Sequence, residues 1–223
     1  MPGCRSLIAC VGVAGLVIAG CTTPPDKFPK PVARVQKIAP VETAEDLLWK
    51  PPAGTAERKW VRIVIHHAAF EGGSLSSIDR LHRVKGWDGV GYHFVIGNGS
   101  MTEDGLVEVG FRWTGQLVGA HCRISQTDDN WVNETGIGIC LVGNMENHSP
   151  SAAQMASLEK LVRYLQNRYH IPLAEVKGHK EFKVTDCPGK YFPWGDFKAA
   201  LLQDQSVAAT PVPPNLIKLT SGR

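Results

Sequence analysis

Histidine and cysteine side chains at three places in the sequence could hold a metal ion. His66 ends a β-branched segment, and His179 and Cys187 stand eight positions apart in a loop-like segment that closes with Pro188-Gly189. Neutral imidazole and thiolate suit Zn²⁺, and three protein ligands leave a fourth position for water, as in catalytic zinc sites. A lone histidine is more often a core or surface residue, so the position of each one must decide.

The segment Trp60–His66 is predicted to be a buried strand, because it is rich in β-branched residues and bounded by polar ones. Neighbouring side chains on a strand point to opposite faces, so one metal ion can bind only one of His66 and His67. The face that carries Ile63, Ile65 and His67 is the more uniformly apolar. The pattern therefore favours a core on that face and a site on the side of His66.

The other elements that must position these residues are a sheet and its helices. Residues 91–96 and 136–142 are predicted strands, residues 74–85 a helix with Gly86 as its C-cap, and a longer helix is predicted to begin at Ser149-Pro150. The longer helix carries an apolar stripe of Met155, Leu158, Leu161, Val162, Leu165 and Tyr169. Helices and strands alternate, so the expected fold class is α/β with a single mixed β-sheet and flanking helices.

Length and charge restrict the class of protein. The 223 residues suffice for one domain of ordinary size plus tails. The 24 Lys and Arg against 21 Asp and Glu leave a net charge of +3, which is too small for electrostatic attraction to a polyanion to dominate. Nucleic-acid binding is therefore not expected, and the single uniformly apolar stretch excludes a multispan membrane protein.

That apolar stretch lies at the N-terminus. Residues 1–20 contain Arg5 and then an uncharged run over 7–19, the form of a signal peptide, and the sequence before Cys21 resembles a bacterial lipobox. The run is shorter than the roughly 17–25 residues that span a bilayer, so a transmembrane anchor is the weaker interpretation. We expect acylation at Cys21, a Pro-rich tether over 21–54, a folded domain over 55–202 and a Pro-containing tail over 203–223.

Seven short motifs, in order, resemble those of zinc N-acetylmuramoyl-L-alanine amidases, a superfamily that includes a phage amidase called a lysozyme and the animal peptidoglycan recognition proteins. The resemblance covers about Trp60 to Leu202. The motifs are Ile65-His66-His67, Val90-Gly91-Tyr92-His93-Phe94, Gly119-Ala120-His121, Ile137-Gly138-Ile139, Leu141-Val142-Gly143, Gly178-His179 and Thr185-Asp186-Cys187-Pro188-Gly189.

The resemblance implies a role for each matching residue. His66, His179 and Cys187 would hold Zn²⁺, in agreement with the strand-face argument for His66. Tyr92 matches the family tyrosine beside the metal, whose phenol can hydrogen-bond the attacking water or the oxyanion. In isolation a strand tyrosine is more often a packing residue. His121 matches a histidine that lines the substrate groove and is not a ligand.

Two departures from the family pattern bear on the chemistry. Thr185 stands where some members carry a lysine that stabilises negative charge, so the oxyanion donor is left open. The anhydro-muropeptide amidases have glutamate and aspartate where this chain has Cys140 and Cys187, so the resemblance is to the phage and recognition-protein branch. Glu181 could then serve as a second-shell partner of the nearby ligand.

Gly86-Trp87 resembles the Gly-Trp pair that accompanies preference for diaminopimelate-containing stem peptides in the recognition-protein branch. As residues of a substrate-binding groove, they would select the stem peptide. The alternative is a helix C-cap glycine followed by a core aromatic residue. The sequence does not decide between these two interpretations.

The implied reaction is zinc-dependent hydrolysis of the amide bond between N-acetylmuramic acid and L-alanine in peptidoglycan or its fragments. One alternative is a peptidoglycan-binding lipoprotein without activity, which would be expected to lack Cys187. A second is a metal-free hydrolase with Cys187 as nucleophile and His179 as base, and a third is a purely structural zinc, which needs a fourth protein ligand. The expected location is the periplasmic side of the bacterial envelope, with a monomeric protein anchored in the outer membrane through Cys21.

A disulfide between the remaining cysteines is not expected. Once the signal peptide, the acylated residue and the zinc ligand are set aside, only Cys122 and Cys140 are left to pair. If His121 points into the groove from a strand, Cys122 points away from it. Cys140, by its match to the glutamate of the anhydro-muropeptide amidases, should face the groove floor. Sulfurs on opposite faces of a sheet cannot reach bonding distance, so both thiols are predicted to be free.

Overall fold

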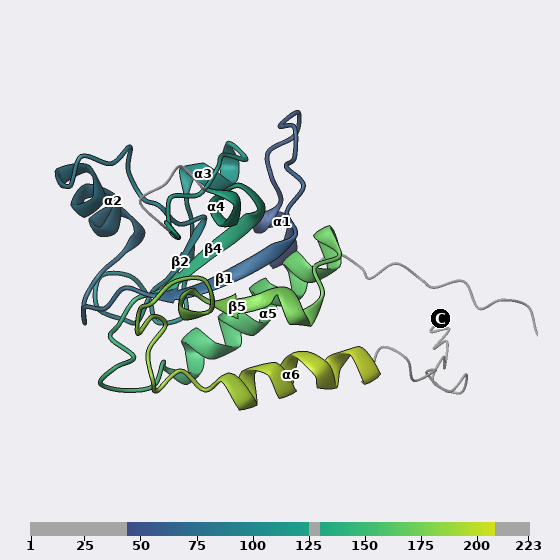
Figure 1. Cartoon of the computed structure of the whole chain (residues 1–223). Coiled ribbons are helices and arrows are strands. Elements are labelled where there is room, and N and C mark those ends of the chain that lie inside the picture. Colours follow the sequence, from purple (N-terminus) through teal and green to yellow (C-terminus); the bar gives the residue numbers. More distant parts are fainter. Residues whose placement is uncertain (1–43, 125–129, 208–223) are drawn as a thin grey trace, which may run out of the picture. The chain divides into compact units, whose positions relative to one another are not determined.

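The computed structural model describes residues 44–124 and 130–207. The predicted signal peptide, the predicted acylation site Cys21 and most of the predicted C-terminal tail lie outside the described residues. Within the described ranges the chain forms one five-stranded sheet with helices on both faces (Figure 1). The prediction of a single mixed sheet with flanking helices is therefore confirmed.

The sheet has the strand order β3-β2-β4-β1-β5. Its strands are β1 (Arg62–His67), β2 (Phe94–Ile96), β3 (Val107–Val109), β4 (Gly136–Leu141) and β5 (Val176–Gly178). β1 pairs in parallel with β4 and β5, and β2 pairs in parallel with β4 and antiparallel with the edge strand β3. The predicted second strand is shorter than expected, because residues 91–93 precede β2 as a loop.

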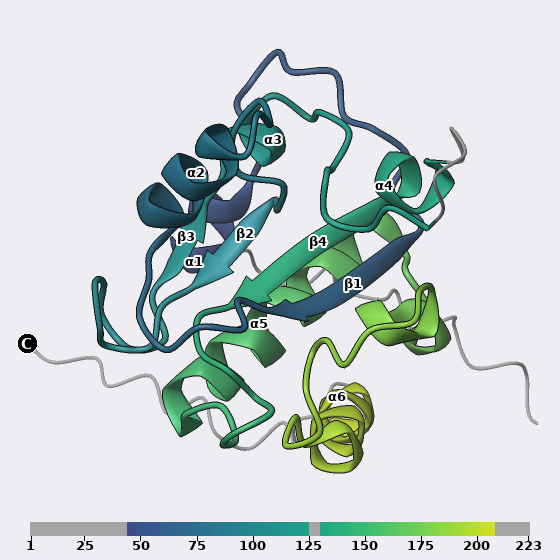
Figure 2. The same ribbon diagram turned by 60° about the vertical axis from the view of Figure 1, so that its left-hand side comes forward.

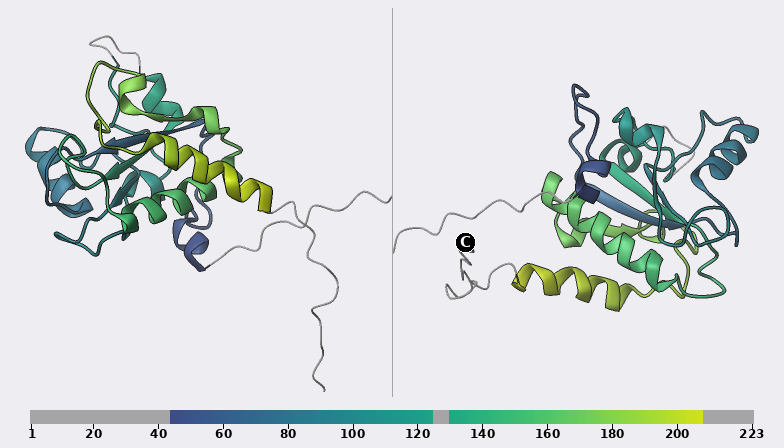
Figure 3. Two further views of the ribbon diagram at one scale, coloured as in Figure 1. Left: turned by 90° about the horizontal axis from the view of Figure 1, so that it is seen from below. Right: turned by 180° about the vertical axis from the view of Figure 1, so that it is seen from behind.

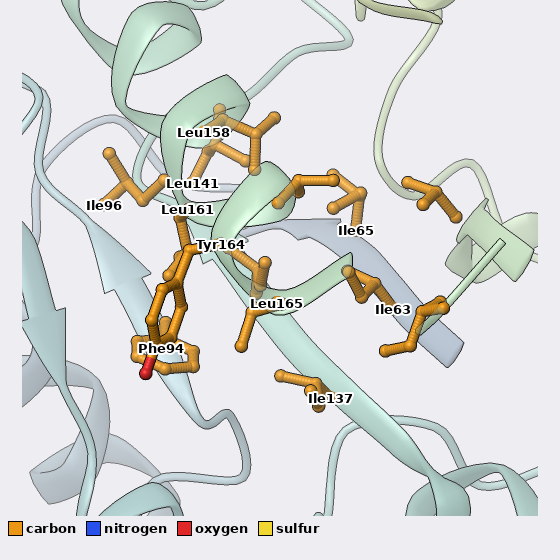
Figure 4. Packing of buried hydrophobic residues seen from close by; sticks show 14 of the residues in the cluster. Ile63, Ile65, Phe94, Ile96, Ile137, Leu141, Leu158, Leu161, Tyr164 and Leu165 are labelled. Carbon is orange, nitrogen blue, oxygen red and sulfur yellow. The ribbon is translucent and has the colours of Figure 1, made fainter. Parts of the chain in front are cut away.

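The two faces of β1 have different partners, as the alternation of its side chains predicts. Ile63 and Ile65 lie in register with Ile137 and Ile139 of β4. These four isoleucines belong to the main core, in which leucines and a tyrosine of helix α5 (Ala152–Tyr169) pack against them from one side (Figure 4). The opposite face carries His66 and is covered by α2 (Leu75–Val84) and α4 (Trp131–Thr135), which bury Ile78 and Val132 against it.

Helix α5 begins two residues later than the sequence analysis placed it. Ser151 is the N-cap: its hydroxyl accepts from the amide of Gln154, whose side chain accepts from the Ser151 amide in return. This reciprocal capping box satisfies two backbone donors at the helix terminus. The helix therefore begins after Ser151 and not at Ser149-Pro150. The predicted stripe is correct, and its six residues pack in or against the main core.

The folded region begins earlier than the predicted boundary at Thr55. Helix α1 (Ala44–Trp49) lies inside the segment 21–54 that was expected to be a tether. Trp49 is 6% exposed, its ring packs at 5.7 Å from that of Tyr164, and its carbonyl accepts a 2.7 Å hydrogen bond from Trp113 Nε1. The high proline content around this helix favoured the prediction of a tether, but Trp49 is part of the main core.

Helices α5 and α6 (Trp194–Val207) lie side by side on the core face of the sheet (Figures 2 and 3). The Arg163 guanidinium of α5 donates to the carbonyls of Ala200 and Leu201 in α6 at 2.6 and 3.2 Å. α6 continues past Leu202, where the domain was expected to end. Short helices α3 (Phe111–Thr114), η1 (Leu173–Glu175) and η2 (His179–Glu181) complete the described elements.

None of the helices in the described part of the chain is both long enough and apolar enough to cross a membrane.

The buried His93 makes the stability of the fold dependent on pH. Its Nδ1 accepts from the Gly138 amide at 3.0 Å, its Nε2 contacts the Leu117 carbonyl at 3.1 Å, and burial lowers its pKa to about 4. The folded chain thus binds fewer protons than the unfolded one between pH 6.5 and 4. The stability that depends on neutral His93 is present in full above pH 6.5. As the pH drops to 4, the free energy of unfolding should fall by about 3 kcal/mol from this residue alone.

Denaturant unfolding of the wild type and of His93→Gln over this pH range measures the effect. Other histidines titrate in both proteins, so the informative quantity is the difference between the two curves. The variant should lose about 3 kcal/mol less than the wild type between pH 7 and 4. Parallel curves would contradict the assignment.

Candidate metal and active site

The sheet topology brings together the three residues that were predicted to hold a metal. His66 lies near the C-terminal end of β1, and His179 begins η2 directly after the parallel neighbour β5. Cys187 follows in the loop after η2. Because parallel strands end at the same edge of a sheet, His66 and His179 meet there, and the loop folds Cys187 back onto them.

The ligand atoms of His66, His179 and Cys187 all lie within 4.8 Å of one another. Cys187 Sγ is 3.6 Å from His66 Nδ1, and the two imidazole rings are 4.6 Å apart. In the described part of the chain, this is the group of three such side chains that could hold a metal ion. Two imidazoles and a thiol form a donor set suited to zinc.

The environment of the three side chains fits a bound cation. Burial lowers the pKa of His66 well below its usual range and that of His179 to about 4, so both rings are neutral and can donate a lone pair. The Nε2 atom of His179 is buried and has no hydrogen-bond partner. Burial also raises the pKa of the Cys187 thiol to about 12. A buried thiol of this kind becomes a thiolate when a metal ion coordinates it.

His67 belongs to the opposite face of β1, as the strand pattern indicates. Its Nδ1 accepts from the amide of Met145 at 3.1 Å, and its own amide lies 3.4 Å from Cys187 Sγ. The ring therefore serves the packing of the loop after β4, while its backbone supports the cysteine. The sequence-based choice of His66 over His67 agrees with this geometry.

Two polar residues hold the loop of Cys187 and the turn of His179. Thr185 Oγ1 accepts from the Cys187 amide at 3.3 Å, and Glu181 Oε1 accepts from the Gly178 amide at 2.8 Å. Glu181 is exposed and bonds the backbone next to His179, and no hydrogen bond joins it to the imidazole among the contacts described. Both residues therefore stabilise the backbone that carries the predicted ligands.

Tyr92 lies beside His66, with 5.1 Å between the ring centroids. Burial raises its pKa well above the usual range, and contact with Cys140 acts in the same direction. Its hydroxyl thus stays protonated and can donate a hydrogen bond. The sequence analysis placed Tyr92 on a strand, but it lies in the loop before β2.

Helix α2 holds this loop in place. Asp79 Oδ1 accepts from the Val90 amide at 2.7 Å, and His82 Nδ1 accepts from the Gly91 amide at 3.1 Å. Gly91 lies so close to the Ala120 carbonyl that a Cβ atom there would overlap it. These contacts fix the backbone immediately before Tyr92.

Gly86 and Trp87 follow the end of α2. Gly86 has a φ of +81°, directly after the C-cap Lys85, so its role as a helix-ending glycine is clear. Trp87 is 46% exposed and its ring lies 4.5 Å from that of His82. Trp87 is therefore not a core residue, and the proposed role of the pair in binding a stem peptide stays a prediction.

His121 lies beside His66, with 5.0 Å between the ring centroids, and is 8% exposed. Its Nδ1 is 3.1 Å from His66 Nε2, and its Nε2 is 3.2 Å from the Gly136 carbonyl. Burial lowers the pKa of His121 well below its usual range. The structure thus joins His121 to a predicted metal ligand, a contact that the sequence analysis did not anticipate for a groove-lining residue.

Asn133 of α4 positions His121 and was missed by the sequence analysis. Its Oδ1 accepts from the amides of His121 and Cys122 at 3.0 and 2.8 Å, and its Nδ2 donates to the Cys122 carbonyl at 3.0 Å. One side chain thereby replaces the hydrogen bonds that a neighbouring strand would supply. Residues 121 and 122 were expected in a strand, and that expectation is wrong.

Cys122 and Cys140 are both free, as predicted, but the stated reason is wrong. Both lie on the same side of the sheet as His66. Cys140 is in register with His66 and packs beside Val95, whereas Cys122 packs against Val64. The two thiols belong to separate apolar clusters on one face of the sheet, so they do not form a disulfide.

Gly138 of β4 provides the space for the His121 ring. A Cβ atom at this position would overlap the imidazole carbons. We expect Gly138→Ala to lower the free energy of unfolding by about 1–3 kcal/mol, the usual cost of overpacking. Gly195→Ala is the matched control, because a Cβ atom there has no neighbour within 4 Å. Denaturant unfolding of both variants tests this, and equal stability of the two would contradict the close contact.

Known proteins resemble this chain in sequence. Peptidoglycan recognition protein 1 of Bos taurus is 37% identical over 108 residues, which is 48% of this chain and 50% of that protein. The endolysin of Escherichia phage T7 is 33% identical over 116 residues, 50% of this chain and 66% of the endolysin. This chain thus spans less than two thirds of either relative.

A solved structure and a family match complete the comparison. The N-acetylmuramoyl-L-alanine amidase LysC from Clostridium intestinale URNW is 35% identical, with a TM-score of 0.55 over 65% of this chain and 86% of that chain. Residues 56–190 match the family described as N-acetylmuramoyl-L-alanine amidase, and they include His66, His179 and Cys187. Since the match extends over more than half of the sequence, this chain belongs to the N-acetylmuramoyl-L-alanine amidase family.

Proposed function

We propose that this protein is a zinc-dependent amidase that hydrolyses the bond between N-acetylmuramic acid and L-alanine in peptidoglycan or its fragments. The observation that carries the proposal is the convergence of His66, His179 and Cys187 within 4.8 Å, inside the region that matches the amidase family. A zinc ion held there supplies a Lewis acid and activates water at neutral pH.

Tyr92 and Thr185 are the proposed catalytic side chains. The protonated phenol of Tyr92, beside His66, can donate a hydrogen bond to the oxygen on which charge develops. The Thr185 hydroxyl accepts from the Cys187 amide and keeps its own proton to donate. A phenol is a stronger acid and hydrogen-bond donor than an aliphatic hydroxyl, so Tyr92 carries the larger share.

Mass spectrometry of digested peptidoglycan tests the reaction. The full chain carrying Cys21→Ser, which lacks the acylation site, would be incubated with purified peptidoglycan. We expect released stem peptides with a free L-alanine amino group, loss of these products with a chelator, and their return with added zinc. Cleavage at another bond, or products that are insensitive to the chelator, would contradict the proposal.

A peptidoglycan-binding protein without activity is the second candidate, since the relatives include a recognition protein. The presence of all three ligand side chains favours the enzyme. Sedimentation with insoluble peptidoglycan separates the two functions. Cosedimentation without any released peptide, in the presence of zinc, would favour the binding protein.

The metal-free hydrolase is the weaker alternative. A cysteine nucleophile reacts as the thiolate and needs a lowered pKa. Burial raises the pKa of Cys187 to about 12, which is the opposite of what such a nucleophile requires.

We further propose that the protein is anchored through Cys21 and acts as a monomer on the periplasmic side of the envelope. The support is the lipobox-like sequence before Cys21 together with a proposed substrate found in that compartment. Incorporation of labelled palmitate into the wild type but not into Cys21→Ser would support the anchor. Equal labelling of both proteins would contradict it.

A further inference from the structure

We propose that His121 is a positioning residue for the ligand His66. It fixes the tautomer of the His66 ring, so that Nδ1 presents its lone pair on the side of Cys187. The inference rests on the proposed zinc site and assigns to His121 a role other than contact with substrate.

The hydrogen bonds of His121 determine where its proton lies. Its Nε2 is 3.2 Å from the carbonyl oxygen of Gly136. A carbonyl oxygen can only accept, so Nε2 of His121 carries the proton. In a neutral imidazole the other nitrogen is then an acceptor, and Nδ1 of His121 therefore offers a lone pair.

That lone pair faces His66. The two nitrogens, His121 Nδ1 and His66 Nε2, are 3.1 Å apart and buried, so one of them must donate. Since His121 Nδ1 accepts, the proton of His66 lies on Nε2. Nδ1 of His66 is left unprotonated, and this is the atom 3.6 Å from Cys187 Sγ.

The opposite tautomer of His66, with the proton on Nδ1, would make two unfavourable contacts. It would place two lone pairs against each other at 3.1 Å between His66 and His121. It would also direct a proton from Nδ1 toward Cys187, where a metal ion needs a lone pair. The relay Gly136 carbonyl, His121, His66 therefore selects the form of the ligand that can bind a metal.

The fold holds the His121 ring in the relay with little freedom. A Cβ atom on Gly138 beneath the ring, or on Gly119 beside it, would contact the imidazole at less than 3 Å. Asn133 binds the His121 amide at 3.0 Å. Metal-bound histidines commonly donate their second nitrogen to a carbonyl or carboxylate, and loss of that partner typically costs about 10–100-fold in metal affinity. Here an imidazole stands between the ligand and the carbonyl.

Two substitutions of His121 separate its two hydrogen bonds. Asparagine places an acceptor, Oδ1, at the position of Nδ1, and so keeps a partner for His66. Glutamine places its polar atoms near the position of Nε2, and so keeps the bond to Gly136 but offers carbon to His66. The proposal requires that the acceptor toward His66 matter more.

The zinc dissociation constant, measured by competition with a chromophoric chelator, is the readout. It would be measured on the full chain carrying Cys21→Ser. We expect His121→Gln to weaken zinc binding by about 10–100-fold and His121→Asn to weaken it by clearly less. His82→Gln is the matched control for fold, because His82 is also 8% exposed and also bonds a backbone group, but it contacts none of the three ligands in the described structure.

Wild-type zinc affinity in His121→Gln, or equal losses in the two variants, would overturn the proposal. If the parent protein binds no zinc, the proposed function itself fails, and that result is distinguishable because it requires no variant. A second measurement needs no substitution at His121. Nitrogen-15 shifts of the His66 ring should show the proton on Nε2, and a proton on Nδ1 would overturn the relay.

Discussion

Cys187→Ala is expected to abolish zinc binding and peptidoglycan hydrolysis together. The substitution removes one of three ligand atoms that lie within 4.8 Å of one another. Two neutral imidazoles bind zinc far less tightly than two imidazoles and a thiolate. Metal analysis of the purified variant and mass spectrometry of its products measure the two losses. Full zinc occupancy in Cys187→Ala would show that the metal is held elsewhere.

His66→Ala and His67→Ala provide a matched pair on one strand. His66 lies on the face of Cys187 and should be required for zinc, whereas His67 binds the Met145 amide on the other face. We expect zinc to be lost in His66→Ala and kept in His67→Ala. The reverse result would show that the zinc ligand is His67, on the other face of β1.

Tyr92→Phe is expected to keep the fold and the zinc but to lower turnover by about 10²–10⁴-fold, the usual contribution of a positioned proton donor or oxyanion group. The ring remains, so its packing near His66 and His82 is retained. The hydroxyl is lost, and with it the contact with Cys140. Steady-state kinetics on a soluble muropeptide, together with zinc analysis, separate the two effects.

Thr185→Ala is the comparison for Tyr92→Phe. Thr185 supports the Cys187 amide through a single 3.3 Å hydrogen bond and offers a neutral hydroxyl. Its removal should lower turnover less than the loss of the Tyr92 hydroxyl. Wild-type turnover in Tyr92→Phe would return Tyr92 to a packing role, whatever the result for Thr185.

The face of β1 that carries the site was predictable because the strand alternates. Ile63 and Ile65 mark the core face by composition, and His66 necessarily points the other way. His179 and Cys187 could not be joined to His66 by spacing, since β5 and the following loop meet β1 only through the sheet order. Their assignment came from the resemblance to a known family.

The segment around His121 could not be predicted for a physical reason. Its backbone is bound by Asn133, a side chain 12 residues further along the chain, and not by a strand ladder. Local periodicity does not reveal such a contact. The argument on the two cysteines assumed a strand at residues 121 and 122. Cys122 and Cys140 were therefore correctly predicted to be free, but on an incorrect argument about opposite faces.

The early start of the folded region decides where the domain can be cut. A fragment that begins at Thr55 would lack Trp49 and would leave Trp113 Nε1 without the carbonyl to which it donates at 2.7 Å. A buried donor without a partner costs about 1–3 kcal/mol, and removal of the Trp49 ring would expose Tyr164 as well. The smallest autonomous unit for crystallisation or for fusion to another protein therefore includes α1, although α1 lies in a segment with the composition of a linker.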